Sequence, residues 1–162
     1  MGRKEEILSL LERNARLTAE EIAVMIGRPA DEVEKTIAGL EKSKVILGYG
    51  AMINWEKTAA APVTALIEVR VTPQRDQGFD HIAQRIYRYP QVKSCYLMSG
   101  GFDLMVIIED MTLKEVAMFV SEKIAPLDSV ISTRTHFILK KYKMGGIEFE
   151  IRDDDHREAV VL

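Results

Sequence analysis

The stretch LEKSKVILGYGAMIN, from Leu40 to Asn54, decides the fold of this chain. It closes an apolar helical pattern and then turns into two short strand-like runs around Gly48 and Gly50. Helical patterns precede this stretch, and alternating strand and helix patterns follow it. A helix followed at once by a small β-hairpin is how a winged helix-turn-helix ends. The stretch therefore predicts a head over residues 1–54 that is joined to a separate, larger domain.

Three helices are predicted in the head. Thr18 and Glu21 match a capping box that starts the second helix, because a hydroxyl and a carboxylate satisfy the free N–H groups there. Pro29 ends the second helix, since it disfavours helical geometry at the residue before it. A third helix follows over about residues 30–43. Its apolar face consists of Val33, Ile37 and Leu40.

The third helix is the candidate DNA-reading element, because the last helix of a helix-turn-helix enters the major groove. The 3.6-residue period places Asp31, Lys35, Ala38 and Lys42 opposite the apolar face. Arg28 lies just before the helix and Lys44 just after it. The residues expected to contact DNA on this basis are Arg28, Asp31, Lys35, Lys42 and Lys44.

The charge of the head is unfavourable for DNA binding. Residues 1–54 hold eight Lys and Arg against nine Asp and Glu, and the whole chain carries a formal charge of −3. Any DNA affinity must therefore come from a local patch. Lys35 and Lys42 supply it only in part, so a solvated helix face without DNA function stays open as an alternative.

Composition describes an ordinary globular protein, with 47% hydrophobic and 29% charged residues in 162. No signal segment and no apolar run of roughly 18 residues is present, so a cytoplasmic protein without a membrane partner is expected. The one cysteine, Cys95, excludes an intrachain disulfide. No nucleophile–base pair, phosphate loop or metal-ligand spacing occurs, so we expect no catalytic residues, no metal and no cofactor.

The body is predicted over residues 63–142, after a connector at 55–62. Strands are expected over 63–71, 92–99, 102–109 and 130–140, and helices over 79–89 and 112–124. The order βαββαβ is that of the ferredoxin-like fold. The chain is therefore expected to be an α+β protein, a winged helix-turn-helix followed by a ferredoxin-like domain. A tail over 143–162 follows, in which Ile147, Phe149 and Ile151 alternate like a further strand.

The predicted sheet has two unequal faces. Alternation along the first strand places Val63, Ala65, Ile67, Val69 and Val71 under the helices. The opposite face should be polar if it is solvated, but it holds Leu66, Met105 and Ile107. We expect a second subunit to cover these residues. An edge loop or the C-terminal tail is the alternative cover.

A turn in the body has the chemistry to bind a free amino acid. Gly100-Gly101 lets backbone N–H groups approach a carboxylate closely. Asp103 is the candidate partner for the ammonium group, and Thr133 and Thr135 are expected to add hydroxyls from a neighbouring strand. The alternative is a β-turn in which Asp103 bonds only its own backbone.

Three stretches together resemble the Lrp/AsnC (feast/famine) transcription regulators, over about residues 4–141. They are Leu40–Asn54, Ser99–Asp103 and Ser132–Thr135. The resemblance implies a cytoplasmic DNA-binding regulator that assembles from homodimers into larger rings, such as tetramers or octamers. It also implies that an amino acid or related metabolite binds between dimers. Met98 and Ser99 join the expected effector residues Gly100, Gly101, Asp103, Thr133 and Thr135.

The chain departs from this family at four positions. Pro29 stands where a Ser commonly caps the recognition helix, and Thr36 where an Arg is common, so Thr36 joins the expected DNA contacts. Lys44 replaces a Gly before the wing, and Gly101 replaces an Asp or Asn in the turn. These changes bear on DNA affinity and on the polarity of the effector site.

Two other functions remain open from the sequence. Some haem-biosynthesis decarboxylases resemble this two-domain layout, but a porphyrin-sized pocket needs basic and His residues, and the chain holds only three His. The acidic head suggests instead a metabolite-binding module that has lost its DNA function.

Overall fold

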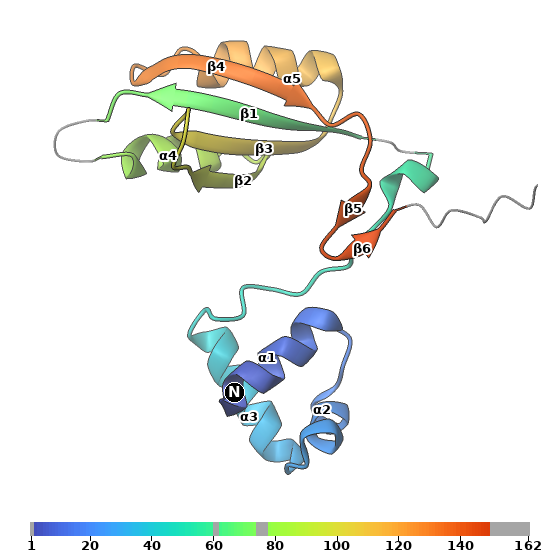
Figure 1. Ribbon diagram of the computed structural model, residues 1–162. Helices are drawn as coiled ribbons and strands as arrows, with labels where there is room; N and C mark the ends of the chain where they lie inside the picture. The colour runs from blue at the N-terminus through green and yellow to red at the C-terminus, as the bar shows by residue number, and fades with distance from the viewer. Residues whose placement is uncertain (1, 60–61, 74–77, 150–162) are drawn as a thin grey trace, which may run out of the picture. The chain divides into compact units, whose positions relative to one another are not determined.

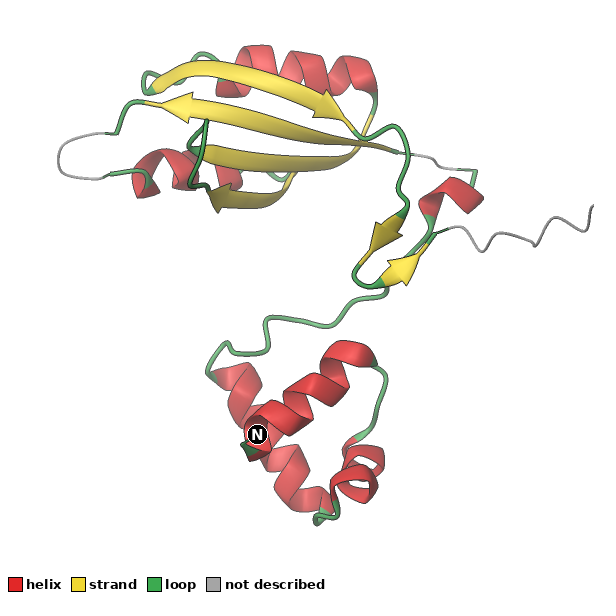
Figure 2. Cartoon of the chain, in the orientation of Figure 1, coloured by secondary structure: helices red, strands yellow, loops and turns green. Residues whose placement is uncertain are grey.

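The computed structural model describes residues 2–59, 62–73 and 78–149 of the chain. These residues form two compact units, Met1–Ile53 and Asn54–Leu162 (Figure 1). The first unit is helical and the second combines helices with an antiparallel sheet (Figure 2). The α+β class is therefore confirmed. The acidic run at 153–155 and the middle of the connector, residues 60–61, lie outside the described residues.

The head contains the three expected helices, α1 (Arg3–Arg13), α2 (Ala19–Ile26) and α3 (Ala30–Lys42). The capping box is formed, because Glu21 N donates to Thr18 Oγ1 at 3.2 Å and Thr18 N donates to Glu21 Oε2 at 2.8 Å. Gly27 ends α2 in the left-handed conformation, with φ of 65°. The buried core of the head consists of Ile7, Leu11, Ile22, Ala23 and Val33.

The end of α3 differs from the sequence-based expectation of a wing. Lys44 adopts a left-handed φ of 59°, its N–H donates to Glu41 O at 3.0 Å, and the N–H of Val45 donates to Leu40 O at 2.9 Å. These two bonds are those of a Schellman motif. Ile46 N–H also donates to Leu40 O, so this backbone is tied to the helix end.

The predicted hairpin around Gly48 and Gly50 was wrong, because residues 44–54 form no strand. An isolated two-stranded hairpin is marginal in water, and nothing in the described chain pairs with this segment. Ile46 packs against the core of the head, but the apolar side chains after it are exposed, with Leu47 at 87% and Tyr49 at 50%. The Tyr49 hydroxyl donates to Glu41 Oε1 at 2.8 Å, which raises the pKa of Tyr49.

The body has the expected βαββαβ order. Its elements are β1 (Val63–Val71), α4 (Asp80–Tyr87), β2 (Val92–Leu97), β3 (Leu104–Met111), α5 (Leu113–Phe119), which continues as η2 (Val120–Ile124), and β4 (Val130–Phe137). The strands lie in the order β2-β3-β1-β4, and every neighbouring pair is antiparallel. A second capping box is formed at the start of α5, between Thr112 and Glu115. This is the ferredoxin-like arrangement.

One face of the sheet packs on α4 and α5 (Figure 1). The inward residues of β1 are Ala65, Ile67, Val69 and Val71, each at most 3% exposed. Leu104, Val106 and Ile108 of β3 lie beside them in the same buried cluster. The predicted alternation holds for these four β1 residues, whereas Val63 precedes a register shift and is half-buried.

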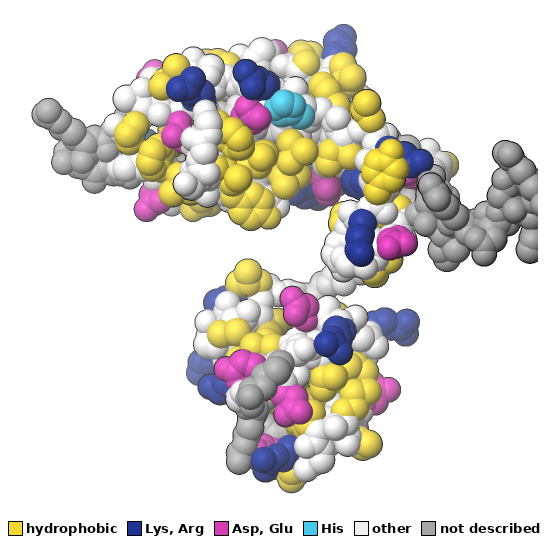
Figure 3. Space-filling model, in the orientation of Figure 1, with side chains coloured by type: hydrophobic (Ala, Val, Ile, Leu, Met, Phe, Trp, Pro, Cys, Tyr) yellow, Lys and Arg dark blue, Asp and Glu magenta, His cyan; other side chains and the backbone are white. Residues whose placement is uncertain are grey.

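The opposite face of the sheet is partly apolar, as expected. Leu66, Met105 and Ile107 are half-buried there, and hydrophobic side chains gather over this face in Figure 3. A hydrogen-bonded pair lies among them, because His136 Nε2 is 3.0 Å from Glu68 Oε1. The pairing depends on the β1–β4 register, which places Leu66 opposite His136.

Two short segments flank the sheet. A 3-10 turn, η1 (Trp55–Lys57), precedes β1. After β4, β5 (Lys143–Met144) pairs with β6 (Ile147–Glu148) through Gly145-Gly146. The alternation around Ile147 therefore corresponds to a strand, while Ile151 lies outside the described residues.

Candidate nucleic-acid interface and effector loop

The outward face of α3 is solvent-exposed at all four predicted positions, Asp31, Lys35, Ala38 and Lys42. Lys35 Nζ donates to Asp31 Oδ2 at 3.1 Å, one helical turn away. The hydrogen bond and the charge of Lys35 lower the pKa of Asp31. Two predicted DNA contacts thus form an ion pair in the free protein, whereas Lys42 has no ion pair with the described residues.

Thr36 lies on the flank of α3 that faces α1, and Arg28 lies in the turn before α3; both line a surface hollow together with α1 residues. The Thr36 hydroxyl donates to the Glu32 carbonyl at 2.8 Å, four residues back along the helix. Lys44 is exposed just past the helix end. The six predicted residues therefore occupy the outward face of α3, one flank of it and the segments just before and just after it, rather than a single patch.

The start of α3 carries no side-chain cap. Pro29 occupies the cap position and has no side chain able to accept a hydrogen bond. Asp31 and Glu32 lie in the first turn. Their charges favour the positive end of the helix dipole, in place of the missing cap.

The predicted effector residues Met98–Asp103 form the loop between β2 and β3. Met98 N–H donates to Asp103 O at 2.8 Å and closes this loop. The Asp103 carboxylate accepts the N–H of Val71 at 2.8 Å, and Asp103 N–H donates to Val69 O at 3.1 Å. Asp103 thus fixes the loop to the end of β1. This is a structural role, but the bonded backbone is that of β1 and not that of the turn itself, which was the alternative considered from the sequence.

Nothing in the described chain requires glycine at positions 100 and 101. Neither has a positive φ, and a Cβ added at either position would meet nothing within 4 Å. Both are exposed. Their small size therefore serves no packing or turn requirement in the free chain.

Thr133 and Thr135 lie farther from this loop than predicted. They pair with Val69 and Ile67 of β1, so β1 separates them from β3. Strands are spaced about 4.8 Å apart, which puts β4 roughly 10 Å from β3. Thr133 pairs with Val69, the β1 residue that is bonded to Asp103, whereas Thr135 lies two residues farther from the loop. One chain therefore does not bring all seven predicted effector residues together.

Three further observations bear on other classes of function. Burial raises the pKa of the half-buried Cys95 thiol, as suits a packing residue. Among the described residues, no cluster of three or more His, Cys, Asp or Glu is arranged to hold a metal. Within the same residues, no helix is long and apolar enough to cross a membrane.

A helix-turn-helix head followed by a ferredoxin-like domain is the architecture of a class of two-domain transcription regulators. Residues 64–147 match the model of the Lrp/AsnC ligand binding domain. An HTH-type transcriptional regulator of Bacillus subtilis, YugG, is 53% identical over 159 residues, covering 98% of this chain and 96% of that protein. The chain belongs to the Lrp/AsnC family of transcription regulators.

More distant relatives agree with this assignment. The leucine-responsive regulatory protein of Haemophilus influenzae is 25% identical and aligns with 85% of this chain and 82% of its own length. A transcriptional regulator from Neisseria meningitidis, solved with L-methionine, has a TM-score of 0.70 at 21% identity, covering 89% of this chain and 93% of that chain. AsnC of E. coli has a TM-score of 0.67 at 18% identity, covering 87% of this chain and 93% of that chain. At these identities the solved structures support the fold alone.

Proposed function

We propose that this regulator reads DNA with α3 and binds an amino acid at the Met98–Asp103 loop, which completes its site in a homo-oligomer. The observation that carries the proposal is the pair of exposed glycines, Gly100 and Gly101, for which the free chain gives no reason. A ligand or a second subunit that approaches the backbone closely supplies that reason.

Asp103 is suited to two roles at once. One carboxylate oxygen accepts the Val71 N–H and holds the loop in place. The second oxygen is the proposed partner of the ligand ammonium, while backbone N–H groups of the glycines bind the carboxylate. The structure of a Neisseria meningitidis relative with L-methionine supports an amino acid as the ligand class.

A second subunit is proposed to cover the apolar sheet face. Leu66, Met105 and Ile107 are half-buried in the isolated chain, beside the exposed Tyr96. Contiguous apolar surface of this kind marks an interaction site. Thr133 and Thr135, which the single chain leaves apart from the loop, would then belong to a site completed by a neighbouring dimer.

DNA binding is proposed to depend on the few exposed cations along α3. Lys35 exchanges its bond with Asp31 for a DNA phosphate, and Lys42 contributes a second phosphate contact. The effector is proposed to change the spacing of the heads, so that the two kinds of site are coupled.

The test is retardation of the chain's own upstream DNA at low and moderate salt, with and without a pool of amino acids. A specific shift that the pool alters is expected. Asp103→Asn is the decisive variant, because Asn keeps an acceptor for the Val71 N–H and removes the charge. It should bind DNA normally and lose the response to the pool.

Two results would count against the proposal. An unchanged response in the Asp103→Asn variant would place the effector elsewhere. Absence of any specific shift at every salt concentration, with amino-acid binding intact, would favour the metabolite-binding module without DNA function, which the Asp31–Lys35 pair and the acidic head suggest.

A further inference from the structure

The head contains a hollow beside the reading helix, on the side of α3 that faces α1 and away from the outward face of Asp31, Lys35 and Lys42. It has a volume of about 290 Å³ and lies between α1, the end of α2 and the flank of α3. Its apolar wall consists of Ile7, Ile26 and Val33. Ile7 and Val33 belong to the buried core of the head, so this wall is rigidly placed. The volume is at the lower end of small-molecule sites, which suits a molecule of amino-acid size.

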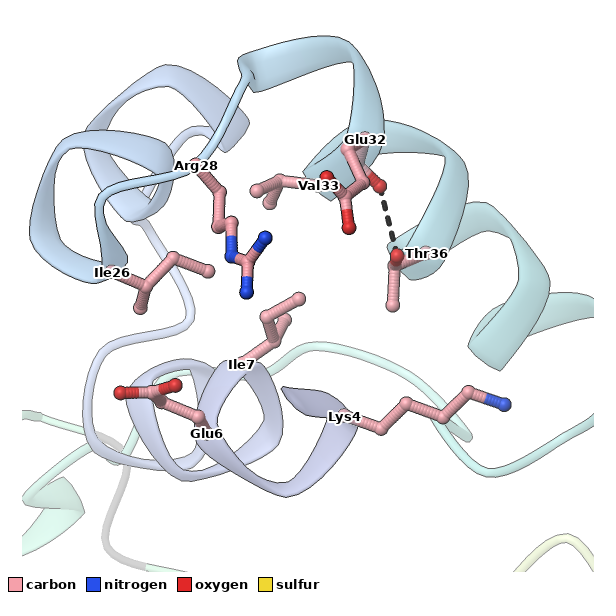
Figure 4. Close-up of a pocket in the computed structure, with 8 residues that line it drawn as sticks. All are labelled: Lys4, Glu6, Ile7, Ile26, Arg28, Glu32, Val33 and Thr36. Atoms are coloured by element: carbon pink, nitrogen blue, oxygen red, sulfur yellow. Dashed lines mark hydrogen bonds between the residues drawn. The ribbon is translucent and has the colours of Figure 1, made fainter. Parts of the chain in front are cut away.

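The rim of the hollow carries both signs of charge. Arg28 extends its guanidinium into the hollow between Ile26, Ile7 and Val33 (Figure 4). That guanidinium forms no ion pair within the described part of the chain. Glu6 on α1 and Glu32 on α3 contribute carboxylates to the rim.

The other two rim residues, Lys4 and Thr36, do not fill the hollow. Lys4 directs its ammonium away from the centre (Figure 4), so Arg28 is the cation that a ligand in the hollow meets. The Thr36 side chain is short, and its hydroxyl is bonded to the Glu32 carbonyl, so Thr36 leaves the space open.

We infer that this hollow binds a small aliphatic zwitterion, an α-amino acid with a branched apolar side chain. The guanidinium of Arg28 matches a carboxylate in a bidentate pair, which is the strongest contact available there. The carboxylate of Glu6 matches the ammonium group. The aliphatic side chain replaces water against the half-buried Ile26, while Ile7 and Val33, at 3% and 1% exposed, form the floor of the hollow.

Occupancy of this site also bears on DNA binding, a consequence that rests on the proposed function. Arg28 is one of the predicted DNA contacts and lies directly before α3. A ligand carboxylate that engages its guanidinium withdraws that cation from DNA. The head would then sense amino acids itself, independently of the body.

The experiment follows methyl resonances in the full-length protein labelled at isoleucine and methionine methyl groups. Ile7 and Ile26 report the hollow, and Met98 reports the effector loop. The probes are L-valine, isovalerate, which lacks the ammonium group, and isobutylamine, which lacks the carboxylate. Valine should shift the Ile7 and Ile26 signals with an affinity about tenfold or more above that of either analogue, because each lacks one charge-assisted contact.

Two variants separate the hollow from the rest of the head. Arg28→Gln should weaken valine binding at Ile7 and Ile26 by about tenfold. Arg16→Gln is the matched control, because it removes the same charge from an exposed residue outside the hollow and should leave the affinity unchanged. The unliganded spectrum of each variant verifies that the head is folded.

The outcomes distinguish this site from the effector loop. Signals of Ile7 and Ile26 that stay fixed while Met98 shifts would overturn the head site and leave the proposed function standing. Shifts at Ile7 and Ile26 with a fixed Met98 would support the head site alone. Equal affinity for valine and isovalerate would overturn the zwitterion assignment. No shift at any of the three residues would overturn the head site and remove support for the loop.

Discussion

Replacement of Lys44 by glycine should stabilise the head. Lys44 holds a φ of 59° as the left-handed residue of the Schellman motif after α3. That conformation costs a non-glycine residue about 1–2 kcal/mol. Glycine avoids this cost but loses about 0.5–1 kcal/mol through its greater freedom in the unfolded chain. The expected net gain in the free energy of unfolding of the head is about 0.5–1 kcal/mol.

Amide hydrogen exchange measures this change locally. The lone tryptophan, Trp55, belongs to the second unit, so its fluorescence would report on the wrong part of the chain. Amides of Ile37 and Leu40 in α3 should exchange roughly two- to fivefold more slowly in Lys44→Gly, while Ile67 in the body should not change.

Lys35→Gly is the matched control, since it makes the same substitution in the interior of α3. Glycine in a helix is unfavourable by about 0.8–1 kcal/mol relative to alanine, so exchange in α3 should become faster. Faster or unchanged exchange in Lys44→Gly would refute the claim that the left-handed backbone at this position carries a cost.

Three further predictions concern single carboxylates. Asp31→Asn releases Lys35 and should raise DNA affinity about fivefold, with a steeper salt dependence. Retardation of DNA at several salt concentrations measures both effects. Equal or weaker binding would contradict the assigned helix orientation. Asp103→Ala should lower stability by about 1–3 kcal/mol in urea unfolding, because it leaves a β1 N–H without its acceptor, whereas Asp103→Asn should cost much less. The Thr112 N–H and hydroxyl lower the pKa of Glu115 below 4.5. The ionised Glu115 carboxylate therefore stabilises the fold fully above pH 4.5, and this stabilisation is lost as the pH falls through the lowered pKa. Glu115→Gln should therefore flatten the decline of stability in acid unfolding.

Much of the fold could be predicted from local patterns. Both capping boxes, the three head helices and the βαββαβ order follow from signals that lie within a few residues of each other. The hairpin after α3 could not be judged in the same way. A strand needs a partner for its backbone, and whether one exists is a tertiary property that alternation around Gly48 and Gly50 does not contain.

The candidate sites show the same division. Periodicity correctly placed Asp31, Lys35 and Lys42 on the exposed face of α3, because helix geometry fixes the face. It did not predict that Thr133 and Thr135 would be separated from the effector loop by β1, since strand order depends on long-range pairing. The hollow around Arg28 was also missed, because its walls come from three helices and no sequence spacing links them.

The acidic charge of the head has a structural explanation that changes its meaning for DNA binding. Six of its nine carboxylates lie in the first turns of helices, namely Glu5, Glu6, Glu20, Glu21, Asp31 and Glu32. A negative charge there stabilises the helix through its dipole. The start of α1 and the start of α3 both lack a side-chain cap, so these charges matter most at those two sites. Of the two carboxylates at the start of α3, Asp31 lies on the exposed face that is proposed to read DNA, so helix stability opposes DNA affinity at Asp31. A net charge near zero in the head is thus compatible with DNA binding, provided that Lys35 exchanges its partner when DNA arrives.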